Sequence, residues 1–417
     1  MKKYRIIGNM TGNSMDAIDL VMTEFHDNEI QDICTYSRPY SSVMQNKIET
    51  LRERVFNKSK DEILALSDFD EIHDEYIKQI ADCINEMCAT NKIDKKTIDA
   101  IGFHGKTLDH NPPSKARLDN STPYTLQIGS GQMLSDLTGL KVIYDFRSDY
   151  ILSNCEGAPL VAPHNAHIAT IEGDGCYYNG GNTANFAIIK NGKAIFNTDV
   201  GPFNDYIDAY VRENTNLPFD KDGELGSRGN LIPALLEFLF EVGKIFYNMP
   251  LPKSGDPTFY NKKQVLDYLS KHQISLEDAV YTLEYFSAYI AVLSLAQIPE
   301  NIEINGKFIV FGGGWKNPII IKSFENILNG DGYILPAHEQ AFKSLRERIN
   351  NKIYIEYSKF GDFMEARLMA DMAKYYLEHK VWEIPECLSK NIIAGIEAIP
   401  VAGRKLYTDK INRAAKS

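Results

Sequence analysis

The sequence has little of what marks secreted, metal-stapled or membrane proteins. Its 417 residues include six cysteines, which are scattered, with no CxxC pair and no Cys/His grouping at zinc spacing. Free thiols in a reducing compartment are the simplest interpretation of that pattern. No apolar run approaches the roughly 20 residues that span a bilayer, and the first ten residues lack the apolar stretch of a signal peptide. We therefore expect a cytoplasmic protein that carries six free thiols and is no membrane protein.

Positive charge is also in deficit. Lysine and arginine together number 45 against 56 acidic residues, which gives a net charge of −11. Such a balance argues against a nucleic-acid-binding surface. It does not exclude a nucleotide, because phosphates can be held by backbone N–H groups, a few cations and Mg²⁺.

The pattern of short strands and helices predicts an α/β fold built from two lobes. A chain of 417 residues exceeds the usual size of one hydrophobic core, and its 44% apolar and 24% charged residues are ordinary for a globular protein. Three β-rich runs, then helices and buried strands, occur twice. We expect lobes at 1–170 and 171–417, with a cleft between them and with the option that the C-terminal helices pack on the first lobe.

The elements of this pattern are expected as follows. The first lobe begins with strands at 4–8, 17–25 and 30–36, continues with a helical region at 43–91, and contains buried strands at 98–104 and 141–146 on either side of a short helix at 132–138. The second cycle has strands at 176–179, 184–190, 194–197 and 308–311, and helices at 204–213, 230–247, 262–270, 276–297 and 363–379.

Two glycine-rich turns, at 8–16 and 311–317, are candidates for nucleotide contact. In the first, Gly12, Asn13 and Ser14 offer backbone N–H and hydroxyl groups to phosphate, and Asp16 is placed to orient a Mg²⁺-bound water. A polar hairpin loop is an equally weighted alternative. In the second, the run Gly312, Gly313, Gly314 leads to Asn317, and three glycines suit a backbone that passes close to a flat ligand such as adenosine. The alternative there is a tight strand-to-helix turn.

Other polar residues stand at expected strand ends. Asp199 follows the last hairpin strand of the second cycle, where a carboxylate is well placed as a general base, although a turn aspartate is the commoner case. His104 and Lys106 close a strand of the first lobe and could contact a sugar or a phosphate, while a structural histidine is the alternative. Arg147 is a candidate anion clamp, or a member of a surface ion pair.

Taken in order, these segments resemble the anhydro-N-acetylmuramic acid kinase family of the sugar-kinase/actin/Hsp70 superfamily. The matching motifs are GNMTGNSMDAID, GFHGKT, TLQIG, VIYDFR, GAPLVAPH, DVGPFNDYIDA, FDKDGELG, FGGGWKNP and EARLMADMA. The resemblance implies two RNase H-like (actin-like ATPase) lobes with a central cleft. It also implies a kinase of peptidoglycan recycling that uses ATP, Mg²⁺ and water to open a 1,6-anhydro sugar and phosphorylate O6, and a homodimer.

The resemblance also assigns roles by position. Asp199 matches the catalytic carboxylate and Glu365 a second acidic residue near the sugar. Gly181 falls in the phosphate turn of the second lobe, and Asp16 is the expected metal ligand. The expected contacts to the sugar come from His104, Lys106, Arg147 and Asn204.

Several positions depart from the family motifs. Lys106 replaces a glutamine, Asn13 a threonine, and Asn182 and Phe203 stand at glycine positions. A side chain at Asn182 or Phe203 is expected to occupy space that backbone–phosphate contacts would use. An active kinase for the anhydro sugar is the leading interpretation. A superfamily kinase or ATPase for another small sugar, and a non-catalytic sensor of sugar or nucleotide, are the alternatives.

Overall fold

The chain folds into two compact α/β units. The computed structural model describes residues 2–12, 15–255, 257–349, 352–404 and 406–416. Unit 1 comprises residues 1–171 together with 363–417, and unit 2 comprises residues 172–362. The C-terminal segment from residue 363 belongs to unit 1, which is the packing that the sequence analysis left as an option.

Unit 1 is built on a mixed sheet with the strand order β13-β7-β4-β1-β2-β3. Strands β1, β2 and β3 form an antiparallel meander, β4 and β7 run parallel to β1, and β13 closes the edge antiparallel to β7. These strands are β1 (Tyr4–Met10), β2 (Ala17–His26), β3 (Glu29–Pro39), β4 (Ala100–Phe103), β7 (Val142–Tyr144) and β13 (Ile396–Ala398). A separate hairpin pairs β5 (Lys106–Asn111) with β6 (Tyr124–Ile128).

Unit 2 repeats this topology. Its sheet has the order β10-β9-β8-β11-β12, with an antiparallel meander followed by two strands parallel to β8. The strands are β8 (Gly175–Gly180), β9 (Thr183–Lys190), β10 (Lys193–Pro202), β11 (Lys307–Phe311) and β12 (Tyr354–Tyr357). The duplication predicted from the sequence pattern is therefore present in the strand order of both sheets.

The helices of unit 1 are α1 (Ser42–Val55), α2 (Lys60–Leu64), α3 (Phe69–Thr90), α4 (Pro113–Asp119), α5 (Gly131–Thr138), α6 (Ser148–Leu152), α7 (Ala162–Glu172) and α14 (Met364–Leu377). Helices α3, α5 and α14 pack on the mixed sheet of unit 1, and further helices surround them. The region 43–91, predicted as continuously helical in pattern, is divided into α1, α2 and α3. Asn57 has a positive φ of 60°, and Ser59 restarts the chain as α2 through a reciprocal capping box with Glu62.

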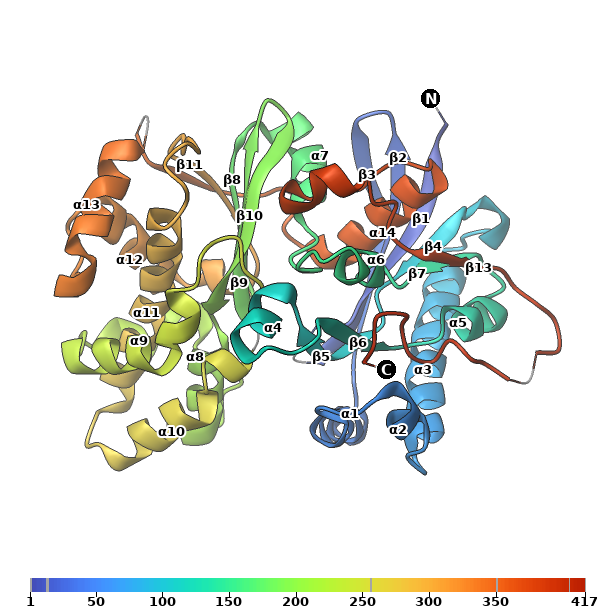
Figure 1. The fold of residues 1–417 in the computed structure, drawn as a ribbon, viewed down its shortest axis with the longest axis horizontal. Coiled ribbons are helices and arrows are strands. Elements are labelled where there is room, and N and C mark those ends of the chain that lie inside the picture. The colour runs from blue at the N-terminus through green and yellow to red at the C-terminus, as the bar shows by residue number, and fades with distance from the viewer. Residues whose placement is uncertain (1, 13–14, 256, 350–351, 405, 417) are drawn as a thin grey trace. The chain divides into compact units, whose positions relative to one another are not determined.

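Helix α14 lies against β1 and β4 at unusually short range. A Cβ added to Gly8 would come within 1.8 Å of the Ala366 carbonyl oxygen, and one added to Gly102 within 2.0 Å of the Met369 carbonyl oxygen. Figure 1 shows α14 beside β1, although nearly the whole chain separates them in sequence. Gly8 therefore lies within strand β1, where its missing side chain admits this helix, and is not part of a ligand-binding turn.

Unit 2 has its core around one long helix. The helices of unit 2 are α8 (Asp205–Asn214), α9 (Pro233–Tyr247), α10 (Lys262–Lys271), α11 (Leu276–Ala296), α12 (Pro318–Asn329) and α13 (Glu339–Arg348). Helix α11 is buried along most of its length and packs on α8, α9, α12 and α13. By length and composition alone it could cross a membrane, which the sequence analysis did not anticipate, but its burial is that of a core helix.

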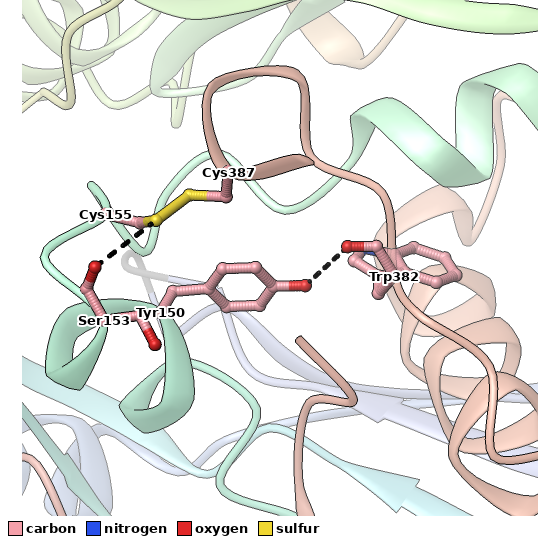
Figure 2. Close-up of a disulfide and its surroundings, with 5 residues drawn as sticks. All are labelled: Tyr150, Ser153, Cys155, Trp382 and Cys387. Atoms are coloured by element: carbon pink, nitrogen blue, oxygen red, sulfur yellow. Dashed lines mark hydrogen bonds between the residues drawn. A yellow bond between two sulfur atoms is a disulfide. The ribbon is translucent and has the colours of Figure 1, made fainter. Parts of the chain in front are cut away.

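The expectation of six free thiols is wrong. Cys155, which follows α6, forms a disulfide with Cys387 across 232 residues of sequence, as Figure 2 shows. The remaining four cysteines are free thiols: Cys34, Cys83, Cys88 and Cys176. Close to the disulfide, the Tyr150 hydroxyl donates to the Trp382 carbonyl at 2.9 Å, so the same two segments are also joined by a buried hydrogen bond. A pairing between partners so far apart leaves no trace in cysteine spacing.

Candidate active site

In unit 1, predicted site residues gather where parallel strands end. Strands β1, β4 and β7 run in the same direction, so their carboxyl ends meet at one edge of the sheet. Gly12 follows β1, His104 follows β4, and Arg147 follows β7. The strand order therefore explains why these residues, which the sequence separates widely, belong to one edge.

His104 and Arg147 are in direct contact. The Arg147 Nε–H donates to His104 Nε2 at 2.8 Å, and Arg147 Nη1 donates to the Gly157 carbonyl oxygen at 2.6 Å. His104 Nδ1 lies 3.0 Å from the Gly105 carbonyl oxygen. Burial and the neighbouring guanidinium lower the His104 pKa to about 3, so the imidazole is neutral and can accept from Arg147. His104 thus holds the guanidinium group of Arg147, the predicted anion clamp, in one orientation.

Lys106 connects this edge to the first glycine-rich turn. It lies on β5 with 2% of its surface exposed, and its Nζ donates to the Gly12 carbonyl oxygen at 2.8 Å. Burial, reinforced by Arg52, lowers the Lys106 pKa to about 7. Lys106 and Gly12, predicted from separate motifs, are therefore brought together, and the lysine holds the turn by its backbone.

Asp16, the predicted Mg²⁺ ligand, is exposed at the start of β2. The two residues predicted with it, Asn13 and Ser14, lie outside the described residues. Among the described histidines, cysteines and carboxylates, the grouping that has metal-ligand spacing does not include Asp16. A Mg²⁺ site does not need such a group, because Mg²⁺ keeps several waters and is commonly held by one or two carboxylates and substrate phosphates.

Glu365, the second predicted carboxylate, is exposed in the first turn of α14. A negative charge there is favoured by the helix dipole. Phe363, the N-cap residue of α14, adopts a left-handed conformation with φ 53°, which sets the direction in which the helix begins. The position of Glu365 is thus fixed by the close packing of α14 on β1.

In unit 2, Asp199 is buried within β10, which extends to Pro202 and so includes this residue instead of ending before it. Its carboxylate Oδ2 accepts from the Gly255 N–H at 2.6 Å and lies 3.4 Å from the Ser254 hydroxyl. The Asp199 N–H in turn donates to the Lys253 carbonyl oxygen at 3.0 Å. The segment 253–255 therefore orients the carboxylate from both sides.

Lys253 places a buried amine close to this carboxylate. Its Nζ donates to the carbonyl oxygens of Phe246 and Tyr247 at 2.7 and 3.3 Å. Burial lowers the Lys253 pKa to about 7, and the charge of Asp199 opposes that shift. The sequence analysis did not identify Lys253 as a candidate, because its burial, with 1% of its surface exposed, depends on the tertiary fold.

The second glycine-rich turn packs on the last two residues of β8 and on Asn204. A Cβ at Gly312, which has φ 92°, would lie 2.7 Å from Asn179 Oδ1 and 2.8 Å from the Gly180 carbonyl oxygen, and a Cβ at Gly314 would lie 2.4 Å from Asn204 Oδ1. Gly312 and Gly314 are thus explained by packing inside the protein. Gly313 has its nearest neighbour, Asn204 Nδ2, at 3.9 Å.

Gly181 resembles Gly313 in having space beside it. A Cβ at Gly181 would have its nearest neighbour, the Thr183 carbonyl oxygen, at 3.7 Å. The Gly181 carbonyl oxygen also accepts from the N–H of Asn204 at 3.1 Å. The structure therefore brings Gly181, predicted at the nucleotide, and Asn204, predicted at the sugar, next to the glycines of the later turn.

Phe203 does not occupy the space in which it was expected. Its side chain is 1% exposed and its ring centre lies 5.0 Å from that of Trp315, in the core of unit 2. The ring fills space beside Gly180 and Gly314 from the protein side. The expectation that Phe203 blocks backbone–phosphate contacts is therefore wrong. The corresponding expectation for Asn182 stays a prediction.

Asn317 is held by a buried acid that sequence reasoning missed. Its Nδ2 donates to Glu284 Oε1 at 2.6 Å, and its Oδ1 accepts from the Ile319 N–H at 2.9 Å, which caps α12. Burial, with the adjacent Asp220, raises the Glu284 pKa to about 9, so Glu284 carries a proton at neutral pH. The single acidic residue in the apolar middle of α11 is the sequence signal that could have identified it.

Asp220 completes this group from the FDKDGELG segment. Its two carboxylate oxygens accept from the N–H groups of Leu225 and Gly226, each at 2.9 Å. Gly226 lies so close to Glu284 that an added Cβ would be 1.9 Å from Oε2. The segment, α11 and the later glycine-rich turn are thus locked together, which gives the motif a structural role.

The class of protein follows from this arrangement. Two α/β units, each with a meander followed by two parallel strands, and with polar turns at the ends of those strands, define the actin-like ATPase and sugar-kinase fold. The chain belongs to the anhydro-N-acetylmuramic acid kinase family, whose model matches residues 4–344. The matched stretch includes Asp16, Asp199 and both glycine-rich turns, and it ends before α14 and Glu365.

Solved structures of this fold class are distant in sequence. Component A of the (R)-2-hydroxyglutaryl-CoA dehydratase of Acidaminococcus fermentans is 10% identical over 88% of this chain and 96% of that chain, with a TM-score of 0.43. A ROK family glucokinase of Streptomyces griseus, in complex with glucose and AMPPNP, is 12% identical over 89% and 99%, with a TM-score of 0.37.

Proposed function

We propose that this protein is an ATP-dependent kinase that opens 1,6-anhydro-N-acetylmuramic acid with water and phosphorylates O6, in the recycling of peptidoglycan. Membership of the anhydro-N-acetylmuramic acid kinase family is the observation that carries the proposal. The orientation of Asp199 by Gly255 supports it, because a general base must be held in one direction to act on a bound water.

The reaction balances with Asp199 as base. Asp199 takes a proton from water while the water oxygen attacks the anomeric carbon, as in inverting glycoside cleavage, and the bond from that carbon to O6 breaks. O6 then attacks the γ-phosphate of ATP, and the bond from that phosphorus to the bridging oxygen breaks to leave ADP. Glu365 and Asn204 are proposed to hold the sugar, and the Arg147–His104 pair its acidic group.

The residues present fit a nucleotide. In the turns that follow β8 and β11, a side chain added at Gly181 or Gly313 would meet no close neighbour, so the space beside the backbone is open to a ligand. Asp16 is proposed to hold Mg²⁺ together with waters and phosphate oxygens, and the ion would offset the charge of the transferred phosphoryl group. The enzyme is proposed to work as a homodimer in the cytoplasm.

The proposal is tested by ADP release with and without 1,6-anhydro-N-acetylmuramic acid. We expect the sugar to stimulate ADP release, and the Asp199→Asn variant to lose most of that stimulation, by roughly the 10²- to 10⁴-fold that a general base contributes. ADP release that ignores this sugar would redirect the proposal to a kinase or ATPase for another sugar. A ligand-induced rise in melting temperature without turnover would favour a sensor.

The nucleotide site has a matched set of glycine variants. Gly313→Ala should keep the melting temperature of the wild type and raise the KM for ATP, because its Cβ enters open space. Gly314→Ala should lower the melting temperature, because its Cβ would overlap Asn204 and Phe203. An unchanged KM in Gly313→Ala would show that this turn does not hold the nucleotide.

A further inference from the structure

Helices α7 and α14 of unit 1 share a buried cluster of two histidines and one aspartate. His164 and His167 lie three residues apart on α7, and Asp371 lies on α14. Both histidine Nδ1 atoms approach the same carboxylate oxygen of Asp371, at 2.8 and 2.9 Å. His164 and Asp371 are fully buried, and His167 is 8% exposed. The proposed kinase reaction uses none of these residues.

The cluster leaves polar atoms without hydrogen-bond partners. His164 Nε2 and Asp371 Oδ1 are buried, and no described atom is bonded to either. The side chain of Asn165, next to His164 on α7, has both its oxygen and its nitrogen in the same condition. A buried polar atom without a partner destabilises the fold, and several on adjoining segments point to a ligand that the protein atoms alone do not supply. Of these atoms, Asp371 Oδ1 belongs to the group that faces both histidine Nδ1 atoms, and it is the one that an ion bound there could use.

The residue types and their spacing fit a divalent transition metal. One ligand atom from each of the three residues lies within 4.8 Å of the other two. A tetrahedral ion bound at about 2.1 Å would separate its ligand atoms by about 3.3–3.4 Å, so the present 2.8 and 2.9 Å contacts need to open by about half an ångström. Two imidazoles with one carboxylate suit zinc and its neighbours, whereas Mg²⁺ prefers oxygen ligands.

The positive charges near the cluster are compensated. Arg367, one turn before Asp371 on α14, donates from Nε to Asp32 at 2.9 Å. Lys374, three residues after Asp371, lies 3.8 Å from Glu378. Both cations of α14 near Asp371 therefore already have acidic partners. A divalent ion bound to Asp371 would not meet unpaired positive charge from them.

We propose that His164, His167 and Asp371 bind a zinc-class transition-metal ion that ties α7 to α14. Helix α7 leads into the first passage of the chain from unit 1 to unit 2, and α14 begins directly after the return at residue 363. The ion would brace the two segments that flank these passages, and it would fix α14, which carries Glu365. The fourth ligand would be Asp371 Oδ1 or a water. This metal is separate from the Mg²⁺ that accompanies ATP.

The first test measures metal in the whole protein. Protein purified without chelator should carry about one equivalent of zinc, or take up one equivalent of Co²⁺ after chelation and show the absorption bands of a tetrahedral ion. Zn²⁺ added to the chelated protein should raise the melting temperature by roughly 5 °C. Neither uptake nor stabilisation in the wild-type protein would overturn the proposal and leave a purely hydrogen-bonded triad.

Variants separate the metal from the hydrogen bonds. Asp371→Asn retains an oxygen that can accept from the histidines but is a poor ligand, so it should fold and lose metal at least tenfold. His73, a buried histidine of α3 that accepts from the Ser130 N–H at 3.0 Å, gives the control variant His73→Asn, which should keep its metal. Equal loss of metal in His73→Asn, or full retention in Asp371→Asn, would also overturn the proposal.

Discussion

Glu284 offers the sharpest test of how unit 2 supports its glycine-rich turn. This side chain has no exposed surface, accepts from Asn317 at 2.6 Å, and lies beside Asp220. We consider the replacement Glu284→Gln, which preserves shape. The glutamine oxygen can still accept from Asn317, and its amide can donate to Asp220 in place of the carboxylic proton.

The magnitude follows from the pKa. In the unfolded chain Glu284 ionises near its ordinary value of 4.5, whereas burial raises the pKa in the folded protein to about 9. Between these values the folded state binds one more proton than the unfolded state, so the stability of the wild type falls as pH rises. The slope is about 1.4 kcal/mol per pH unit, or about 4 kcal/mol between pH 5 and pH 8. Glutamine titrates in neither state, so the variant lacks this loss.

The assay needs a signal from unit 2 alone, because two compact units need not unfold together. The chain has two tryptophans, Trp315 in unit 2 and Trp382 in unit 1. In a Trp382→Phe background, denaturant unfolding followed by the fluorescence of Trp315 reports the stability of unit 2. We expect the advantage of Glu284→Gln over Glu284 to grow steadily from pH 5 to pH 8. Glu237→Gln, at an exposed position of α9, is the matched control and should change nothing.

Parallel stability curves for Glu284 and Glu284→Gln would refute the reasoning. They would mean that Glu284 ionises in the folded protein as it does in the unfolded chain. The buried carboxyl group would then carry its charge in the folded protein at neutral pH.

Two further predictions concern groups whose burial is as complete. Burial lowers the Lys253 pKa to about 7 from 10.5, so the unfolded state binds more protons between these values and stability rises with pH there. Wild type should therefore gain about 1.4 kcal/mol per pH unit over Lys253→Met from pH 7 to pH 9 in denaturant unfolding, and a constant difference would contradict this. Gly8→Ala would press on the Ala366 carbonyl and should destabilise unit 1 by about 1–3 kcal/mol or more, measured by the fluorescence of Trp382 in a Trp315→Phe background. An unchanged midpoint would show that α14 can move away.

The elements and the repeat could be predicted from the sequence. Alternation of apolar residues over 17–25 and helical spacing over 276–297 record which face of each element is buried, and burial is what the sequence pattern encodes. The carboxyl ends of β4 and β11 could also be predicted from the sequence, because a buried apolar run followed by glycines is typical of a strand that ends in a turn. Asp199, His104 and Arg147 were identified as candidates because each stands at the end of an expected strand.

The structural role of a particular residue depended on contacts with residues far away in the sequence. Gly8 was predicted as part of a ligand-binding turn, yet it makes room for α14, whose contact with β1 no local pattern reveals. Phe203 was expected at a phosphate site, yet its ring packs on Trp315 in the core of unit 2. In the sequence, Glu284 is an acidic residue in the apolar middle of α11. Its role follows only from the structure, which places Asn317 and Asp220 beside it.

By itself, the sequence determined the class of the protein and the order of its elements, because periodicity and turn residues act within a few positions of one another. The tertiary structure decided the partners. Cys155 and Cys387 are 232 residues apart, and His164 meets Asp371 across 207 residues. Such pairs form when the last segment of the chain returns to the first unit, and their energy comes from burial that no local stretch of sequence contains.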